Sequence, residues 1–173
     1  ITYAGTGYIE PNDSYGYFFQ NDLRCLSVFG DWAYKSGKLY MYFGSENPET
    51  QSVQIPTIDK IINLSSRSFI KVENLNLQGA NRDGVYSTGT NNTISKCNIS
   101  FVGDNGIQGW FGSKFLTVDS CMISYSNNRG IFCVENHSTF SRNYIHNIGQ
   151  LRGMNATNGN SGYTGIASHG SGA

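Results

Sequence analysis

Four segments of the sequence repeat one pattern of apolar residues: Val72-Glu-Asn-Leu-Asn-Leu77, Ile94-Ser-Lys-Cys-Asn-Ile99, Val118-Asp-Ser-Cys-Met-Ile123 and Phe140-Ser-Arg-Asn-Tyr-Ile145. The first apolar residue recurs after 22, 24 and 22 residues, and the last recurs with the same steps. A second apolar piece follows each segment, at Gly84-Val85, Gly106-Ile107, Gly130-Ile131 and Gly165-Ile166. The final step between these pieces is 35 residues, so the fourth repeat carries an insertion.

The repeating pieces are predicted to be strands and not helices. No stretch places apolar residues at helical spacing over three turns, and Gly and Asn interrupt every candidate. Turn sequences such as Asn105-Gly106 and Asn128-Arg-Gly130 tolerate a positive φ angle. A strand-only repeat of this length predicts one coil of a right-handed parallel β-helix, in which each strand pairs with its equivalents on the neighbouring coils. We therefore expect an all-β solenoid with about four recognisable coils over residues 52–173.

The N-terminal region, residues 1–51, does not follow this repeat. Val28–Tyr34 and Lys38–Phe43 flank Lys35-Ser-Gly37, a pattern that predicts a β-hairpin. A polar loop then leads into the first coil, where Ile55 and Ile61-Ile62 are expected to be early strand residues. The sequence thus predicts a β-rich N-terminal region with a hairpin, followed by the β-helix.

The C-terminal end of the chain, Ala173, follows a strand and a turn where another coil is expected. Terminal repeats of a solenoid need a cover, because an open strand edge pairs with other chains. We therefore expect the β-helix to be truncated here and to continue in a longer parent protein.

Composition excludes several classes of partner. Lys and Arg number 12, as do Asp and Glu, so no electrostatic footprint for nucleic acid appears. No apolar run approaches the roughly 18 residues of a membrane span. The four cysteines lack metal-ligand spacing, and we expect neither a metal nor a cofactor.

Cys97 and Cys121 share a column of the repeat, where we favour stacked reduced thiols over a disulfide. Asn143 continues that column and needs internal hydrogen-bond partners, most simply backbone groups at a turn.

The repeats resemble those of the pectate-lyase-like β-helix superfamily over roughly residues 52–173. Gly30-Asp-Trp-Ala-Tyr34 and Lys38-Leu-Tyr-Met-Tyr42 resemble a segment found before the helix in many bacterial carbohydrate-active members. The resemblance implies a secreted or surface-bound glycoside hydrolase or polysaccharide lyase, with a polysaccharide or oligosaccharide as its partner. The alternative is a non-catalytic β-helix that binds glycans or has a structural role, because one scaffold hosts several functions. The polygalacturonase fingerprints and a calcium-binding Asp cluster are absent from the sequence.

Two outward columns precede the second strand of each coil, and they are Arg82/Asp104/Asn128 and Asp83/Asn105/Arg129. Asp83 and Asp104 lie on adjacent coils and are the candidate catalytic carboxylates. Their spacing is expected to approach the roughly 5–5.5 Å of retaining glycosidases, with the 6.5–9.5 Å of inverting enzymes as the alternative. Arg82 and Arg129 are candidates for binding uronate carboxylates or for lyase chemistry. The competing interpretation is that all of these are ordinary turn residues.

A second patch follows the second strand, where the aligned residues are Thr88/Trp110/Val134/His169 and Gly89/Phe111/Glu135/Gly170. Trp110 and Phe111 are candidates for a platform on which sugar rings stack. Glu135 is a candidate acid or base, and His169 a candidate substrate contact. Alternatively, the aromatic side chains cover the side of the solenoid or contact the hairpin.

The insertion, Gln150–Thr164, is the loop in which we most expect binding residues. Loops extending from a rigid scaffold often carry binding groups. Arg152 and Tyr163 are its candidate substrate-binding residues. The alternative is a mobile surface loop without a binding role.

Overall fold

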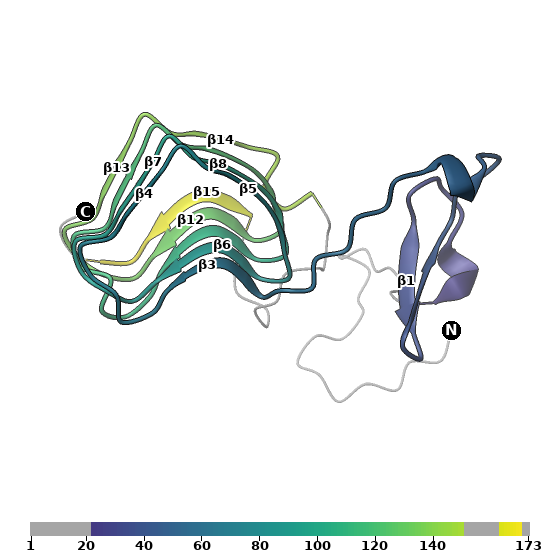
Figure 1. Ribbon diagram of the computed structural model, residues 1–173, viewed down its shortest axis with the longest axis horizontal. Helices are drawn as coiled ribbons and strands as arrows, with labels where there is room; N and C mark the ends of the chain where they lie inside the picture. Colours follow the sequence, from purple (N-terminus) through teal and green to yellow (C-terminus); the bar gives the residue numbers. More distant parts are fainter. Residues whose placement is uncertain (1–21, 151–162, 171–173) are drawn as a thin grey trace, which may run out of the picture. The chain divides into compact units, whose positions relative to one another are not determined.

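The computed structural model describes residues 22–150 and 163–170 of the chain (Figure 1). The chain folds into two compact units, Ile1–Val53 and Gln54–Ala173. Each unit is considered by itself below.

The first unit contains the predicted hairpin. Strands β1 (Trp32–Lys35) and β2 (Lys38–Met41) pair antiparallel, with Trp32 opposite Met41 and Lys35 opposite Lys38. The two turn residues, Ser36 and Gly37, have φ angles of 52° and 77°. Two consecutive positive φ angles match the twist of paired strands, which explains the tight connection. Short 3₁₀ turns precede and follow the hairpin, η1 (Leu23–Cys25) and η2 (Pro48–Thr50).

The described strands of the second unit form three parallel sheets, which we name after their first strands. The β4 sheet contains β4 (Lys71–Glu73), β7 (Thr93–Ser95), β10 (Thr117–Asp119) and β13 (Thr139–Ser141). The β5 sheet contains β5 (Asn76–Ala80), β8 (Asn98–Val102), β11 (Met122–Ser126) and β14 (Tyr144–His146). The β3 sheet contains β3 (Lys60–Leu64), β6 (Asp83–Ser87), β9 (Asn105–Gly109), β12 (Arg129–Cys133) and β15 (Thr164–Ser168).

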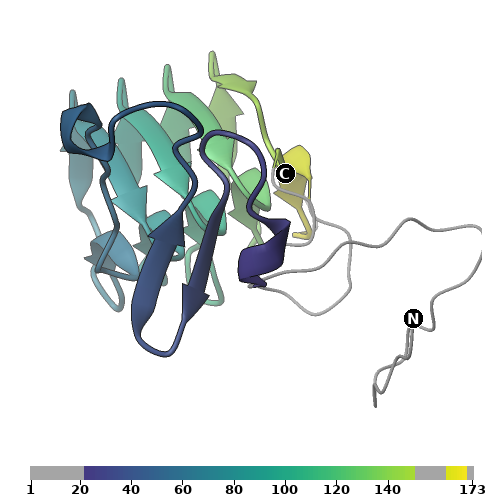
Figure 2. The same cartoon turned by 90° about the vertical axis from the view of Figure 1, so that its right-hand side faces the viewer.

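The order of these strands is that of a solenoid. Each coil contributes one strand to each sheet in turn, so sequence neighbours lie in different sheets and equivalent strands pair in parallel. Figure 1 shows the coils as nested outlines, and Figure 2 shows them side by side. The predicted fold, an all-β parallel solenoid of about four coils with a hairpin on its N-terminal side, is confirmed.

The pairing register reproduces the sequence repeat. Val118 pairs with Ile94 on one side and Phe140 on the other, and Ile94 pairs with Val72. The last apolar residues of the repeat pair in the same way, through Leu77, Ile99, Ile123 and Ile145. The prediction for Ile55 is wrong, since this residue precedes β3 and is 60% exposed. Stacking equivalent apolar residues from successive coils forms one continuous core inside the solenoid.

Two asparagines at the turns of the coil form hydrogen bonds with backbone groups. Asn143 accepts a hydrogen bond from the Cys121 amide and donates one to the Val118 carbonyl, both at 2.9 Å, as expected from the sequence. Asn92, fully buried, accepts from the Ile70 amide and donates to the Arg67 carbonyl at 2.7 Å. These side chains bridge neighbouring coils at their turns, because a buried backbone group without a partner is costly.

The cysteines are all free, including the stacked pair Cys97 and Cys121. Burial raises the pKa of the Cys121 thiol, so this residue behaves as a small apolar side chain of the core. The preference for reduced thiols over a disulfide is confirmed.

Candidate functional site

The outer face of the β3 sheet carries the predicted site residues. Each strand of this sheet arches toward the interior of the coil (Figure 1). In β6 the second and third residues, Gly84 and Val85, face the core. A Cβ atom added at Gly84 would meet Ile99 in the core, and Val85 is fully buried. The first and fourth residues of the strand therefore face outward, as three contacts between them show. These contacts join Lys60 to Tyr86, Asp83 to Gln108, and Arg129 to Phe132.

Asp83 is a buried carboxylate at the start of β6. Its Oδ1 accepts a hydrogen bond of 3.1 Å from Nδ2 of Asn105 on the next coil. Gln108, with its amide nitrogen turned toward the carboxylate, donates to both oxygens at 3.0 and 3.1 Å. Burial raises the pKa of Asp83 to about 6, and the negative charge of Asp104 adds to this effect. Asp83 is thus a carboxyl group that gains and loses its proton near pH 6.

Asp104 lies one residue out of register on the neighbouring coil, as expected from the alignment. Its Oδ1 accepts a hydrogen bond of 2.7 Å from Nδ2 of Asn128. Its Oδ2 lies 4.0 Å from the guanidinium of Arg82, whose side chain is half exposed. The side chain of Asp104 is almost fully buried. The structure therefore brings together Asp83, Asp104 and Arg82 in a polar cluster that spans successive coils.

Glu135 occupies a different place. It follows the end of β12, and its Oε1 accepts a hydrogen bond of 2.8 Å from the Gly112 amide of the preceding coil. The length of the strand separates it from the Asp83 end of the sheet. All three candidate carboxylates are thus held by hydrogen bonds between coils, but only Asp83 and Asp104 are brought together.

An aromatic cluster covers the other end of the same face. The Trp110 ring lies 5.1 Å from that of Phe111 and 5.8 Å from that of Phe132, measured between centroids. His169 meets Phe132 edge-on at 5.3 Å. Trp110 and Phe111 are exposed, at 36% and 65%, whereas Phe132 is buried, at 7%. The guanidinium of Arg129 lies 4.2 Å from the Phe132 centroid. In the sheet, Arg129 pairs with Asn105, the hydrogen-bond donor to Asp83.

A family model described as a right handed beta helix region matches residues 57–172. The chain belongs to the right-handed β-helix family. Comparison with curated proteins and with solved structures gave no match. The family describes the scaffold, on which different proteins carry different sites. What this β-helix does is therefore argued from its own side chains.

The insertion of this β-helix is described only at its ends. Arg152 lies outside the described residues. Tyr163 is exposed, and its amide donates a hydrogen bond to the carbonyl of Asn128, next to the polar cluster. Tyr163 thus lies beside the site, at the start of β15.

Two members of the site were missed from the sequence, Gln108 and Phe132. Both sit at the fourth position of their strands, where simple alternation from the buried residue before them points outward. Both are nonetheless buried, at 6% and 7%, which alternation within a single repeat does not predict.

Over residues 22–150 and 163–170, no group of three or more His, Cys, Asp or Glu side chains is placed to hold a metal ion. No helix in the described residues is long and apolar enough to cross a membrane.

Proposed function

We propose that this β-helix binds an extended glycan along the outer face of the β3 sheet, as part of a secreted or cell-surface polysaccharide-processing protein. The aromatic cluster supports the proposal most strongly. Two exposed rings, Trp110 and Phe111, lie in contact just after β9, and the Trp110 ring also contacts the buried Phe132 of β12. Flat aromatic faces pack against the CH faces of sugar rings, and fixed rings lose little conformational entropy on binding.

Polar groups around the rings suit the hydroxyls of a sugar. His169 and Glu135 lie at the same end of the sheet, and the guanidinium of Arg129 lies over the ring of Phe132. Equivalent positions recur on each coil at the spacing of paired strands, about 4.8 Å. A chain molecule lying across the coils therefore meets several of these positions, which favours a polymer over a small ligand.

Replacement of Trp110 with Ala is expected to weaken polysaccharide binding about tenfold, since one stacked ring contributes on the order of 1 kcal/mol. The measurement is affinity gel electrophoresis over mannan, mixed-linkage β-glucan, xylan and polygalacturonate. Trp32→Ala is the matched control, because Trp32 is 44% exposed but lies on the hairpin. Equal retardation of both variants and the wild type by every polysaccharide would contradict the proposal.

A second candidate function is hydrolysis of the bound glycan, favoured by Asp83. A carboxyl group with a pKa of about 6 beside another carboxylate fits the division between general acid and base in glycoside hydrolases. A lyase is the alternative chemistry and would draw on Arg82, Arg129 and His169.

If the chain hydrolyses glycans, Asp83→Asn and Asp104→Asn abolish release of new reducing ends from the same polysaccharides. Products that absorb ultraviolet light through an unsaturated bond indicate the lyase. Unchanged release in both variants would exclude the two carboxylates.

A further inference from the structure

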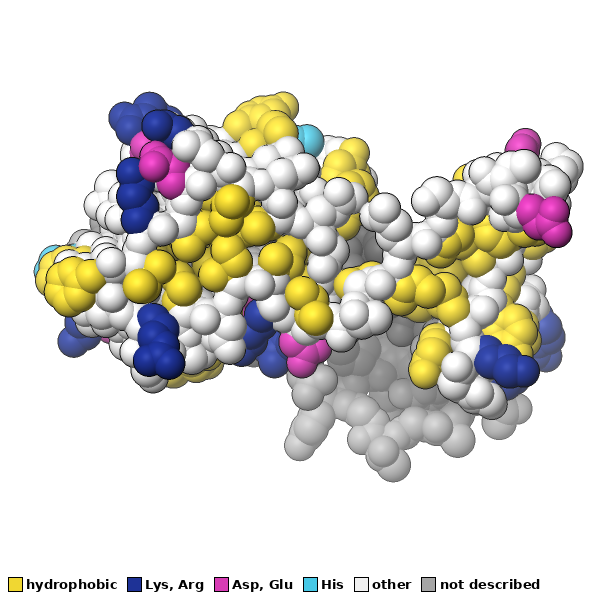
Figure 3. Space-filling view, in the orientation of Figure 1, with side chains coloured by type: hydrophobic (Ala, Val, Ile, Leu, Met, Phe, Trp, Pro, Cys, Tyr) yellow, Lys and Arg dark blue, Asp and Glu magenta, His cyan; other side chains and the backbone are white. Residues whose placement is uncertain are grey.

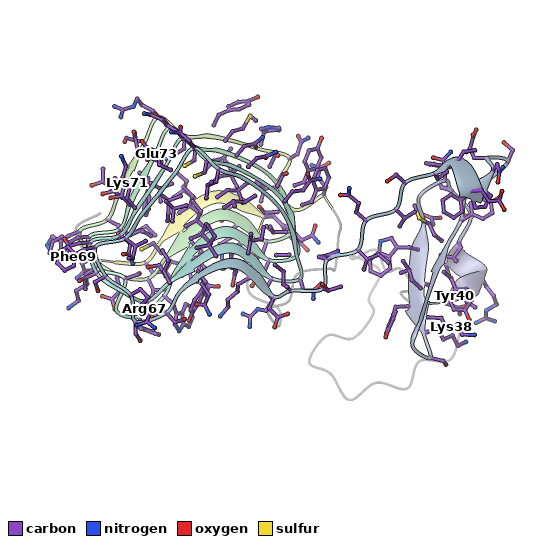
Figure 4. The ribbon with its side chains drawn as sticks, in the orientation of Figure 1. Lys38, Tyr40, Arg67, Phe69, Lys71 and Glu73 are labelled. Atoms are coloured by element: carbon purple, nitrogen blue, oxygen red, sulfur yellow. The ribbon has the colours of Figure 1, made fainter. Side chains whose placement is uncertain are left out.

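The outer face of the β5 sheet differs from the other two faces in carrying no charged side chain among its described positions. Its outward residues are Asn76, Gln78, Gly79, Asn98, Ser100, Phe101, Met122, Ser124, Tyr125, Tyr144 and His146. The β4 sheet, by contrast, displays ion pairs such as Lys71 with Glu73 at 2.8 Å and Arg142 with Asp119 at 2.6 Å. Figure 4 labels Lys71 and Glu73 on this side, and Figure 3 shows a group of side chains of both charges there. The uncharged face therefore carries mainly amides, hydroxyls and aromatic rings.

Two exposed rings on this face form a stack that follows the solenoid. Phe101 and Tyr125 are 53% and 41% exposed, with parallel planes at 1° and centroids 4.7 Å apart. Their φ angles, 55° and 53°, are both left-handed, so the two backbones present the rings identically. The ring separation equals the spacing of paired strands, and the ring faces are therefore directed along the solenoid axis.

The stack has no third ring at one end. Gly79 occupies the next position of the same column, since its neighbours Gln78 and Ala80 pair with Ser100 and Val102. A Cβ atom added at Gly79 would find a single neighbour within 4 Å, Cβ of Pro56 at 3.9 Å. No side chain of this column therefore covers the second face of Phe101.

We propose that the outer face of the β5 sheet is a second carbohydrate-binding surface, on which a sugar ring of an uncharged glycan stacks on Phe101 in the place left by Gly79. The exposed amides of Asn76 and Gln78 border this place and can donate to and accept from hydroxyl groups. The lack of charge favours a neutral sugar over a uronate. A protein partner would require a larger continuous apolar patch, whereas each ring here is flanked by polar side chains.

This inference goes beyond the proposed function, because it concerns a different face and none of the residues of the aromatic cluster. The test uses Phe101→Asn, since Asn already adopts the left-handed conformation at Asn74 and Asn91 and keeps the backbone unstrained. Phe115→Asn is the matched control. Phe115 is 49% exposed, has a φ angle of 58° and stacks on His137, but it belongs to the corner where Figure 4 labels Phe69.

Affinity electrophoresis in mannan and in mixed-linkage β-glucan, with polygalacturonate as the charged comparison, measures the effect. The variants are made in the Trp110→Ala background, which isolates this face from the β3 sheet. Phe101→Asn is expected to weaken binding to a neutral glycan about five- to tenfold, and Phe115→Asn to leave it unchanged. Gly79→Tyr fills the open place and is expected to abolish the same binding. Its melting temperature is expected to fall slightly, because the φ angle of 80° at Gly79 strains a larger residue.

Equal affinities of Phe101→Asn and Phe115→Asn for the neutral glycans would overturn the inference, as would retained binding in folded Gly79→Tyr. Absence of neutral-glycan binding in the Trp110→Ala background would also overturn it. The proposed function would fail separately, through an unchanged affinity when Trp110 alone is replaced.

Discussion

Asp83→Asn is expected to stabilise the folded chain at neutral pH by about 1–3 kcal/mol, because it removes a buried charge. The replacement amide keeps hydrogen bonds to the same two neighbours, Asn105 and Gln108. Its oxygen accepts from Asn105, and its nitrogen donates to Gln108 once that amide turns over. The measurement is the free energy of unfolding by urea at several pH values, for the wild type and the variant.

The pH dependence of the free energy of unfolding shows whether Asp83 stabilises or destabilises the fold. Burial raises the pKa of Asp83 from 3.8 to about 6, so the folded chain holds this proton more tightly than the unfolded chain. The contribution of Asp83 to stability is therefore fully present below about pH 4 and is lost as the pH rises through about 6. The variant is expected to lose this dependence.

Asp119→Asn is the control of opposite sign. Hydrogen bonds from Ser141 and Arg142 lower the pKa of Asp119, so its charged form stabilises the fold at neutral pH. This variant is expected to lose stability at neutral pH and to approach the wild type as the pH falls. If Asp83→Asn were less stable than the wild type at pH 7, the ionised carboxylate would be a stabilising group and the account of Asp83 would be wrong.

Gly106→Ala is expected to destabilise the β-helix by about 3 kcal/mol, through steric overlap in the core. The added Cβ would lie 2.4 Å from Cγ2 of Ile123 and 2.6 Å from the carbonyl oxygen of Gly130. The carbonyl belongs to the backbone of the next coil and can move only if the coils separate. Thermal and urea unfolding measure the loss.

Gly165→Ala is the matched control for this replacement. Gly165 occupies the same column on the last described coil, and its added Cβ would find only Ile145 at 3.8 Å. The free energy of unfolding of Gly165→Ala is expected to stay within about 0.5 kcal/mol of the wild-type value. Equal stability of both variants would mean that the coils are not packed as described.

The β-helix fold and its strand register could be predicted from the sequence, because the repeat is consistent with only one arrangement of strands. The steps of 22, 24 and 22 residues that join Val72, Ile94, Val118 and Phe140 recur in the last apolar column. They indicate equivalent positions on successive coils, and the strand register follows those steps directly. For polar residues in the same columns, the sequence also predicts the type of hydrogen-bond partner. The backbone partners of Asn143 are an example, since an amide inside a turn has few other options.

The chemistry of the site was less predictable, because it depends on contacts between coils. The columns that contain Asp83 and Asp104 follow from the alignment. The hydrogen bonds of the two carboxylates do not, since they come from Asn105, Gln108 and Asn128 on neighbouring coils. The sequence makes Glu135 a candidate acid or base, but it does not predict the hydrogen bond that the Gly112 amide of another coil donates to its carboxylate.

Hydrogen exchange with and without a glycan tests the central claim most directly, that a polysaccharide lies on the outer face of the β3 sheet. The probe is whichever of mannan, mixed-linkage β-glucan, xylan and polygalacturonate retards the chain most strongly. Slower exchange in peptides covering residues 105–112 and 129–135, and its loss in Trp110→Ala, is the result that we expect. Protection confined to other parts of the chain, or the same protection in Trp110→Ala, would contradict the claim.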